Sequence, residues 1–529
     1  MRIYAGSDHA GFSLRKTVVE RLRAQGKDVV DLGTDSDTAC DYPEFAYAVA
    51  SKVRSEPGAA GILVCATGQG MAMAAGKVRG IRAAVPSSIE GARLSRIDND
   101  ANVLCLAGRM LSETDACAMV DTWLSTNFAG GRHARRIAKV AAIETASAVA
   151  FMTESERLHL AGRGFPRKLF QRDPSLFSPD GSLHATIRSD LGWVSLPQEM
   201  GGKVPEILAF ADHVRQARLK DVVLLLDSEE DSAIGSVCRL WGTSGMRMHI
   251  AQARRPESLA RIEEMVHLES TLVLIYSPVA RMGKELQGEE QRLRSKMMDH
   301  RLGNAQRTGQ HFAALTISGS DLVQVAESHR YAKVFLDSIN VDGCSAALGF
   351  AGLVPAVLAG LDPVRLVARA NAMAEACRGE RLEDNPGASL GVLLGAMAKH
   401  GRHKLTLLAS KSLEPLVRWI SLLMTRATHK ARRGIVVIGD EPLQSSYPPD
   451  RVFVQLQAPD DPSSIPPESM EALHIAGQPY IQIVVQDKLE LAAEIFRWQV
   501  AAATAAIVLE AIPCERALGA GGDSGQATA

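Results

Sequence analysis

The chain has 529 residues, and at roughly 100–200 residues per domain this length predicts two to four domains. Hydrophobic residues make up 46% and charged residues 22%, a composition that excludes a largely disordered or fibrous chain. Lys and Arg number 59 against 60 Asp and Glu, so the net charge is −1, and aromatic residues make up 5%. We therefore expect neither a nucleic-acid partner nor a charged membrane surface as a partner.

The eight cysteines are scattered, without a C-x-x-C pair, which argues against a zinc site or another metal site. The first residues lack the long apolar run of a secretory signal. The longest apolar stretches, such as Val500–Leu509, fall short of the ~20 residues that span a bilayer. We expect a cytoplasmic protein with reduced thiols.

Strand and helix patterns alternate through the first part of the chain, and this rhythm predicts a doubly wound parallel sheet covered by helices. The predicted strands are Arg2–Ala5, Asp28–Leu32, Ala60–Cys65, Ile81–Val85 and Val103–Ala107, and the predicted helices are Phe12–Gln25, Phe45–Val53 and Glu113–Leu124.

The rest of the chain begins with a connector rich in Gly, Pro and Ser, residues 149–189, in which we expect one or two helices. Strand and helix patterns then resume, which again indicates α/β structure. The strand candidates are Asp221–Asp227, Thr271–Tyr276, Lys404–Ala409 and Gly434–Ile438, and the helix candidates are Leu348–Leu358 and Asp487–Leu509. The glycine-rich tail, residues 514–529, is expected to be disordered.

The segment after Ala60–Cys65 carries the most local information. A strand ends in Cys65, the loop ATGQG follows, and a helix is predicted to begin near Met71. Backbone N–H groups at such a helix start hold anions and favour a thiolate. Cysteine at a strand end is also often a small buried apolar residue. A dinucleotide site is not indicated, because Met73 stands where the third glycine of G-x-G-x-x-G belongs.

Other polar segments strengthen the case for a site. SDHAG places Asp8 and His9 at the carboxyl end of a strand, where open α/β sheets bind ligands. Arg132 and Arg136 share a helical face beside His133, and forked guanidiniums suit a phosphate. The simpler explanations are a helix cap for Asp8 and a solvated basic helix face for the arginines. Taken together, the segments predict a thiol, an anion-binding loop and a phosphate clamp.

Eight motifs, in order along the first domain, resemble those of the ribose-5-phosphate isomerase B family, which includes subunits of galactose-6-phosphate isomerase. They are SDHAG, DLGT, DYP, CATGQGM, GIRAAV, LSR-x-x-ND-x-NVL, AGRM and GGRH-x-x-R, and we assign residues 1–148 to this domain. The resemblance implies a doubly wound parallel sheet and aldose–ketose isomerisation of a phosphosugar without a metal or cofactor. It also implies a homodimer, or a higher homo-oligomer, with active sites at the subunit interface.

The resemblance assigns roles residue by residue. Cys65 is implied as the base that moves a proton between C1 and C2 of the sugar through an enediolate. Thr67 and Asp98 are implied to help catalysis and ring opening. The implied substrate-binding residues, some contributed by a partner subunit, are Asp8, His9, Tyr42, Ala66, Gly68, Gly70, Asn99, Arg109, Arg132, His133 and Arg136.

One position departs from the family pattern in a way that bears on activity. Asp98 stands where the family has a histidine that opens the furanose ring. An ionised carboxylate has no proton to donate, so we expect weakened ribose 5-phosphate isomerisation or a different phosphosugar such as allose or galactose 6-phosphate. Loss of activity is the further alternative. Ala66, in place of a common glycine, is a milder change.

Residues 190–513 resemble the glucose-6-phosphate isomerase half of bacterial transaldolase/phosphoglucose isomerase fusions. The resemblance is carried by LGWVSLP, DVVLLL, GFAGLVPAVLAGLD, NPGASLGVLLGAMAKHGRHKLTLLAS and EIFRWQ. It implies two sugar-isomerase (SIS-like) subdomains, each an α/β sandwich, at residues 190–345 and 346–513.

The functional motifs of that second family fit badly. The phosphate loop is replaced by the acidic Asp227–Ser232, the hydroxyl-rich motif by Tyr276–Glu285, an arginine by Cys344 and a catalytic glutamate by Arg426. We therefore expect an inactive module that stabilises the oligomer, binds a regulatory ligand or docks a transaldolase. Two alternatives remain: a bifunctional enzyme with a working glucose 6-phosphate site, and a sensor or scaffold that binds phosphosugars without turnover. The basic run His429–Arg433 is interpreted as a solvated face.

Overall fold

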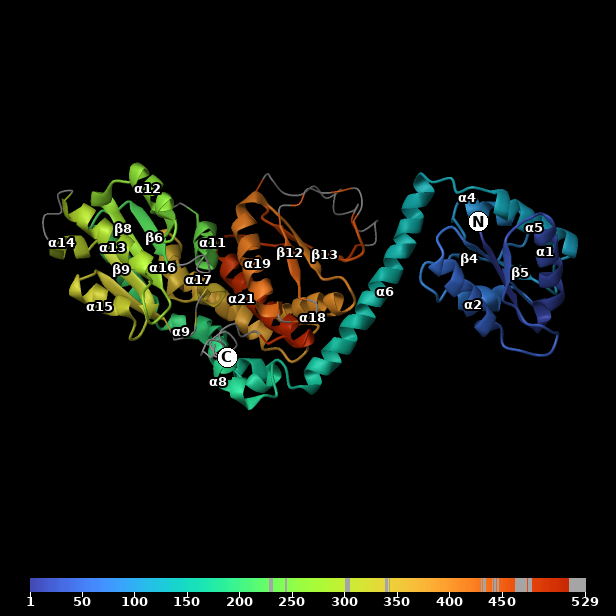
Figure 1. Cartoon of the computed structure of the whole chain (residues 1–529), viewed down its shortest axis with the longest axis horizontal. Helices are drawn as coiled ribbons and strands as arrows, with labels where there is room; N and C mark the ends of the chain where they lie inside the picture. Colours follow the sequence, from blue (N-terminus) through green and yellow to red (C-terminus); the bar gives the residue numbers. More distant parts are fainter. Residues whose placement is uncertain are drawn as a thin grey trace, which may run out of the picture. The chain divides into compact units, whose positions relative to one another are not determined.

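The computed structural model describes residues 1–512 with internal gaps. The gaps are residues 228–231, 243–244, 300–304, 338–340, 342, 430, 432–433, 440, 442–443, 445–446, 462–472 and 474–477. The predicted tail, most of the acidic loop after Asp227 and part of the basic run His429–Arg433 therefore lie outside the described residues. The chain forms two compact units, unit 1 from Met1–Ser147 and unit 2 from Ala148 onward (Figure 1).

Unit 1 is a five-stranded parallel sheet with the strand order β2-β1-β3-β5-β4. Its elements are β1 (Ile3–Ser7), the 3₁₀ turn η1 (His9–Gly11), α1 (Phe12–Ala24), β2 (Val29–Asp31), α2 (Tyr42–Ser55), β3 (Ala60–Cys65), α3 (Gln69–Ala75), β4 (Ala83–Ala84), α4 (Ile89–Ile97), β5 (Val103–Ala107), α5 (Glu113–Ser125) and the start of α6 (Arg132–Gly162). The predicted parallel α/β domain is confirmed.

Both faces of this sheet are covered by helices, with α2 on one side of the strands and α1 and α5 on the other (Figure 1). Side chains of a strand alternate between its faces, so Ile62 and Val64 pack against α1 and α5. Leu63 and Cys65 pack on the face that α2 and α3 cover. The unbroken apolar run of β3 is therefore explained by burial on both faces.

The helix α6 is longer than the sequence pattern indicates. Its first turn contains the predicted Arg132–Arg136 pair, but it continues for 31 residues, so the predicted domain boundary at residue 148 falls inside it. Phe151 is 79% exposed and Leu158 is 67% exposed. Because large apolar side chains occur on its exposed surface, α6 lacks the one-sided periodicity on which helix prediction depends.

Unit 2 contains two parallel sheets, of order β10-β9-β8-β6-β7 and β12-β11-β13-β14. Its strands are β6 (Asp221–Leu226), β7 (Arg247–Gln252), β8 (Thr271–Ser277), β9 (Phe312–Ile317), β10 (Lys333–Asp337), β11 (Lys404–Ala409), β12 (Val436–Ile438), β13 (Arg451–Gln457) and β14 (Tyr480–Val484). The predicted strands in this region are confirmed, whereas β7, β9, β10, β13 and β14 were not predicted.

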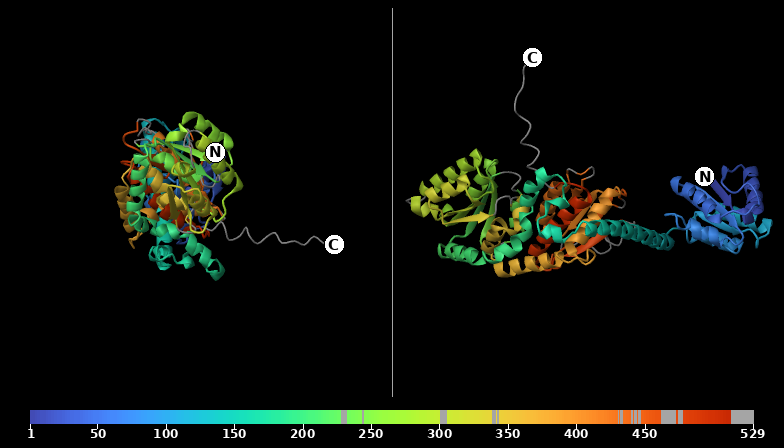
Figure 2. Two further views of the ribbon diagram at one scale, coloured as in Figure 1. Left: turned by 90° about the vertical axis from the view of Figure 1, so that its left-hand side faces the viewer. Right: turned by 90° about the horizontal axis from the view of Figure 1, so that it is seen from below.

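Helices and 3₁₀ turns connect these strands. In chain order they are α7 (Arg167–Phe170), η2 (Pro174–Leu176), η3 (Gly181–Leu183), α8 (His184–Asp190), η4 (Gly192–Ser195), α9 (Leu196–Gly201), α10 (Val204–Gln216), α11 (Ser232–Leu240), α12 (Pro256–Met265), η5 (Leu268–Ser270), α13 (Lys284–Met297), α14 (Ala305–Gly309), α15 (Asp321–Ser328), η7 (Gly343–Leu348), α16 (Phe350–Leu358), α17 (Pro363–Cys377), α18 (Pro386–Lys399), η8 (Lys411–Leu413), α19 (Glu414–Thr428) and α21 (Glu490–Val508). Helices lie on both sides of the β6–β10 sheet (Figure 2).

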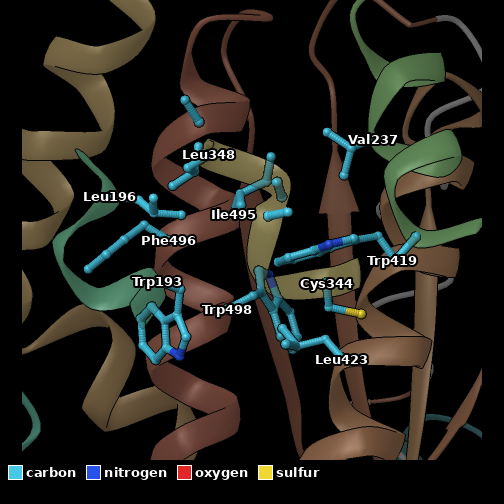
Figure 3. Packing of buried hydrophobic residues seen from close by; sticks show 14 of the residues in the cluster. Trp193, Leu196, Val237, Cys344, Leu348, Trp419, Leu423, Ile495, Phe496 and Trp498 are labelled. Carbon is cyan, nitrogen blue, oxygen red and sulfur yellow. The ribbon is translucent and has the colours of Figure 1, made fainter. Parts of the chain in front are cut away.

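The helix α21 lies in the main core of unit 2, between α17, α18 and α19. Phe496 extends from α21 toward Trp193 and Leu196, and its ring centroid lies 5.6 Å from that of Trp193 (Figure 3). Of the described helices, α21 alone has the length and hydropathy of a membrane span, and 94% of that stretch is buried within the protein. Its apolar composition is accounted for by this core position.

A buried carboxylate on α21 makes the stability of unit 2 depend on pH. Burial raises the pKa of Glu494 from 4.5 to about 7, although Arg497 lies 3.2 Å from one of its oxygens. The folded chain thus binds this proton more tightly than the unfolded chain does. The unfolding free energy therefore falls as the pH rises from 4.5 to about 7, by about 3 kcal/mol for this group.

We expect Glu494→Gln to remove this part of the pH dependence. The measurement is the urea midpoint at pH 5.5 and pH 8, followed by the fluorescence of the buried tryptophans of unit 2, Trp193, Trp241, Trp419 and Trp498. Glu375→Gln is the matched control, since the side chain of Glu375 is 74% exposed. An equal loss of stability between the two pH values in the wild type and Glu494→Gln would contradict the assignment.

Candidate functional site

The carboxyl ends of β1, β3 and β5 form the edge of unit 1 where the predicted thiol lies. Ser7 pairs with Val64, and Cys65 pairs with Ala107, so the three strands end at one level. Residues 8 and 66 directly follow β1 and β3, and residue 109 is the second residue after β5. The strand order runs outward in both directions from β1 and β3, and such a switch point is where open α/β sheets leave a crevice for a ligand.

The Cys65 thiol is held by the loop that follows it. The backbone N–H of Gly68 donates to Cys65 Sγ at 3.2 Å, and the side chain of Thr67 is exposed beside it. Gly68 has φ +76°, and a Cβ there would lie 3.1 Å from a Val85 methyl group, so this loop requires glycine. This N–H contact fixes the position of the sulfur at the end of β3.

A second cysteine in the same core provides a contrast. Cys105 lies on β5, is fully buried, and burial raises the pKa of its thiol far above the ordinary value. Such a thiol stays protonated and inert at neutral pH. Cys65 and Cys105 both lie in the core, and they differ in position: Cys65 ends its strand, whereas Cys105 lies in the middle of its strand.

The SDHAG turn is locked onto this edge by short-range contacts. Asp8 is buried and accepts from the N–H of Gly11 at 3.0 Å, so it caps η1, as the simpler explanation of its role predicted. A Cβ on Gly11 would lie 2.3 Å from the carbonyl oxygen of Val64, which explains the glycine. His9 Nδ1 lies 3.2 Å from both the N and the O of Cys40.

Tyr42 joins the same group through α2. It is the first residue of α2 and is 39% exposed, and a Cβ on Gly70 would lie 2.8 Å from its ring. The ring therefore lies against the backbone of the loop that follows Cys65. Cys40 was not predicted as part of this arrangement, and its one signal is its place just before the DYP motif.

The backbone of the loop after β5 completes the edge. Gly108 N–H donates to the carbonyl of Cys65 at 2.7 Å, and Arg109 N–H donates to that of Ala66 at 3.1 Å. The Arg109 side chain is exposed. Nine of the predicted residues thus gather at the carboxyl edge: Asp8, His9, Tyr42, Cys65, Ala66, Thr67, Gly68, Gly70 and Arg109.

The remaining predicted residues lie at the opposite edge of the sheet. The carbonyl of Asn99 accepts from Arg82, which directly precedes β4, and Asn102 O accepts from Gly61 N–H near the start of β3. Four residue steps of about 3.3 Å separate Gly61 from Cys65, so the two edges are about 13 Å apart. Within one chain, Asp98 and Asn99 therefore lie near the edge opposite to the one where β3 ends in Cys65.

A small charged network surrounds Asp98 at this second edge. Asp98 caps the C-terminus of α4, and its carboxylate lies 3.5 Å from Nδ1 of His133. Arg132 Nε donates to Nε2 of the same imidazole at 3.1 Å. Arg136 is exposed one turn further along α6. The first turn of α6 thus carries two guanidinium groups and an imidazole, and their role as a phosphate clamp stays a prediction.

In unit 2, the switch point of the β6–β10 sheet lies between β6 and β8 and is occupied by a carboxylate. Asp227 is buried, and its Oδ2 accepts from Gly283 N–H at 3.3 Å and lies 3.4 Å from Ser277 Oγ. The Gly283 N–H and the Ser277 hydroxyl are thus directed at a carboxyl side chain of the protein itself.

Cys344 and Arg426, the positions that depart from the second family, both line a cavity of about 60 Å³. Gln499, from α21, donates to the carbonyl oxygens of Cys344 and Ser345 there, at 3.3 Å each. Among the described residues, no group of three or more His, Cys, Asp or Glu side chains is placed to hold a metal ion.

Unit 1 is thus a doubly wound α/β domain with a thiol at the switch point, a glycine-containing loop after it and a cationic helix end. Residues 3–140 match the Ribose/Galactose Isomerase family model. The chain belongs to the ribose/galactose isomerase family through this domain.

Relatives of unit 1 carry the names of aldose–ketose isomerases. Probable ribose-5-phosphate isomerase B of Mycoplasma pneumoniae is 42% identical over 143 residues, which are 27% of this chain and 94% of the relative. Ribose-5-phosphate isomerase B of Escherichia coli is 43% identical over 143 residues, or 27% and 96% of the two chains. The crystal structure of the Mycoplasma genitalium enzyme with bound ribulose-5-phosphate is 43% identical, covers 27% of this chain and 95% of its own, and has a TM-score of 0.27.

A longer structural similarity includes unit 2. A hypothetical protein of Thermus thermophilus has a TM-score of 0.56 at 18% identity, over 68% of this chain and 94% of its own. A match of that length exceeds unit 1, so it extends through much of unit 2. It shows that the fold of this region occurs in another protein.

Proposed function

We propose that the protein interconverts ribose 5-phosphate and ribulose 5-phosphate at a site built on unit 1. The observation that carries the proposal is the position of the Cys65 thiol, which ends β3 at the switch point and accepts an N–H bond from the following loop. The family membership of residues 3–140 supports the substrate class.

In the proposed reaction the Cys65 thiolate removes the proton from C2 of the open-chain aldose. The C1 carbonyl oxygen takes up the negative charge of the enediolate and then receives the proton of the C2 hydroxyl. The same thiol returns the proton from carbon to C1, which leaves a ketone at C2 and a hydroxyl at C1. The loop of residues 66–70 follows the sulfur directly, and its N–H groups and the Thr67 hydroxyl would stabilise the developing negative charge. Asp8 and Tyr42 border the same crevice and would contact sugar hydroxyls.

The two halves of the predicted site lie on opposite edges of the sheet, and we propose that a second copy of the chain brings them together. The carboxyl edge of one subunit would supply Cys65, while the amino edge of the other would supply Asn99 and the Arg132–Arg136 clamp. A C2 dimer makes two such sites at once, because each subunit presents both edges.

Unit 2 is proposed to be a non-catalytic, SIS-like module. Asp227 places a buried carboxylate at its switch point, and Arg426 stands at a position where the resemblance implies a catalytic glutamate. A site without its acid/base carboxylate and without a cradle for phosphate lacks most of what isomerisation requires.

The test is isomerisation of ribose 5-phosphate by the full-length protein, followed as the formation of ribulose 5-phosphate. We expect turnover of ribose 5-phosphate and no turnover of glucose 6-phosphate. Turnover of allose or galactose 6-phosphate alone would keep the reaction and correct the substrate. Saturable binding of all these phosphosugars without turnover would replace the proposal by a sensor.

We expect Asp98→His to raise kcat on ribose 5-phosphate several-fold. The resemblance implies a ring-opening histidine at this position, and an imidazole can donate a proton at neutral pH where an ionised carboxylate cannot. Asp100→His is the matched control, since Asp100 pairs with Arg82 and Arg96 instead of with His133. An unchanged kcat in Asp98→His would show that ring opening does not limit turnover.

A further inference from the structure

A groove in unit 2 lies at the carboxyl ends of β6 and β7, where Leu226 and Gln252 pair at the last position of the two strands. The helices α11 and α12, which follow these strands, form two of its walls, and α19 forms a third. Its volume is about 600 Å³, within the ~300–1,000 Å³ range of small-molecule sites.

Each of the three helices brings an arginine and a serine to this groove with the same spacing. Residues three apart on a helix share a face, so each hydroxyl lies beside the guanidinium of its own helix. The pairs are Ser236 and Arg239 on α11, Ser258 and Arg261 on α12, and Arg418 and Ser421 on α19.

The lining carries an excess of positive charge. Arg255 is a fourth guanidinium in the groove, and Glu257 is the one carboxylate among its described lining residues. Within the described part of the chain, no ion pair engages Arg239, Arg261 or Arg418. Burial, and then the like charge of Arg418, lower the pKa of Arg239, so two unpaired guanidiniums of different helices repel each other across the groove.

We propose that this groove binds a small soluble molecule that carries two or more phosphate groups. Guanidiniums from three helices line the groove together with the hydroxyls of Ser236 and Ser421, and such groups recognise phosphate oxygens in two-point contacts. The third hydroxyl, that of Ser258, donates to the carbonyl of Arg255 at 2.7 Å. A bound polyanion would neutralise the repulsion between Arg239 and Arg418. The proposal is independent of the isomerase site, because every lining residue belongs to unit 2.

A nucleic acid fits the groove less well than a small molecule does. No aromatic side chain is among its described lining residues, whereas base-stacking surfaces depend on aromatic rings. The chain as a whole has a net charge of −1, so it lacks the basic excess typical of proteins that follow a phosphate backbone. The apolar part of the lining comes from Leu226, Ile250 and Leu422.

The test is equilibrium dialysis of the full-length protein against inorganic pyrophosphate at low and moderate salt. We compare the wild type with Arg239→Gln/Arg418→Gln. The matched control is Arg365→Gln/Arg369→Gln, which removes the same charge from the exposed face of α17. All three proteins keep the cationic residues of unit 1, so pyrophosphate bound there contributes equally to each measurement.

We expect the groove variant to bind pyrophosphate at least tenfold more weakly at this site, so that it binds one pyrophosphate fewer per chain at the concentrations that saturate the wild type. The control should retain wild-type binding. Pyrophosphate should also raise the melting temperature of the wild type and the control more than that of the groove variant. Equal binding by all three proteins, or equal weakening in both variants, would overturn the proposal. Isomerase activity should be unchanged in the groove variant. The binding measurement on unit 2 therefore gives the same answer whether or not unit 1 is an isomerase.

Discussion

Replacing Cys65 by alanine is expected to lower kcat for ribose 5-phosphate isomerisation by about a thousandfold, with little change in KM. The thiol is the one group at the end of β3 that can take a proton from carbon, and its removal leaves the phosphate-binding and hydroxyl-binding residues in place. The loss should therefore fall on the chemical step rather than on substrate binding. The measurement is a steady-state assay of the purified full-length protein.

Cys105→Ala is the control for this experiment. It removes a thiol from the same face of the same sheet, two residues short of the end of β5. Its thiol is held protonated by burial, so its loss should leave kcat within a few-fold of the wild type. A Cys65→Ala protein that keeps more than a tenth of wild-type kcat would remove Cys65 from the role of base and move the search to another group at the carboxyl edge.

The sequence predicted the strand that carries Cys65 because local and tertiary signals agree there. An apolar run of six residues, bounded by turn residues, has one consistent interpretation as a strand buried on both faces. Two glycines were informative for the same reason: Gly68 of the following loop adopts a positive φ, and Gly11 of the SDHAG turn leaves no space for a side chain against Val64.

The sequence could not show which predicted site residues lie together. Asp98 and Cys65 occur in motifs of equal clarity, yet one follows a helix and the other ends a strand, and this difference places them at opposite edges of one sheet. The contact of the His9 ring with the backbone of Cys40 could not be predicted either, because Cys40 lies in a loop without secondary structure. Contacts of this kind are set by tertiary packing and leave no periodic signal.

In unit 2, the sequence predicted much of the scaffold but did not reveal the arginine groove. Its scaffold segments predicted several strands and the core helices α16 and α21, because buried apolar runs are readable without knowledge of their partners. The arginine groove escaped the sequence analysis, since its three Arg–Ser pairs are separated by up to about 180 residues and each alone has the composition of a solvated helix face.

Mixing two inactive variants should restore activity if the site is shared between subunits. Arg132→Ala/Arg136→Ala removes the cationic clamp, and each lost charge-assisted bond to phosphate contributes about 1.5–3 kcal/mol, so kcat/KM should fall at least a hundredfold. Co-expression with Cys65→Ala produces mixed dimers in which one site receives the intact carboxyl edge of one chain and the intact amino edge of the other. Random pairing then predicts about a quarter of wild-type activity, since half of the dimers contain one intact site of two.

The control mixture combines Cys65→Ala with Arg109→Ala, two defects at the same edge. Each site of such a mixed dimer receives one defective carboxyl edge, so no activity beyond that of the parents should return. Recovery in the first mixture and none in the second would place the two groups of residues on different subunits of one site. Equal activity in both mixtures would mean that each chain completes its own site.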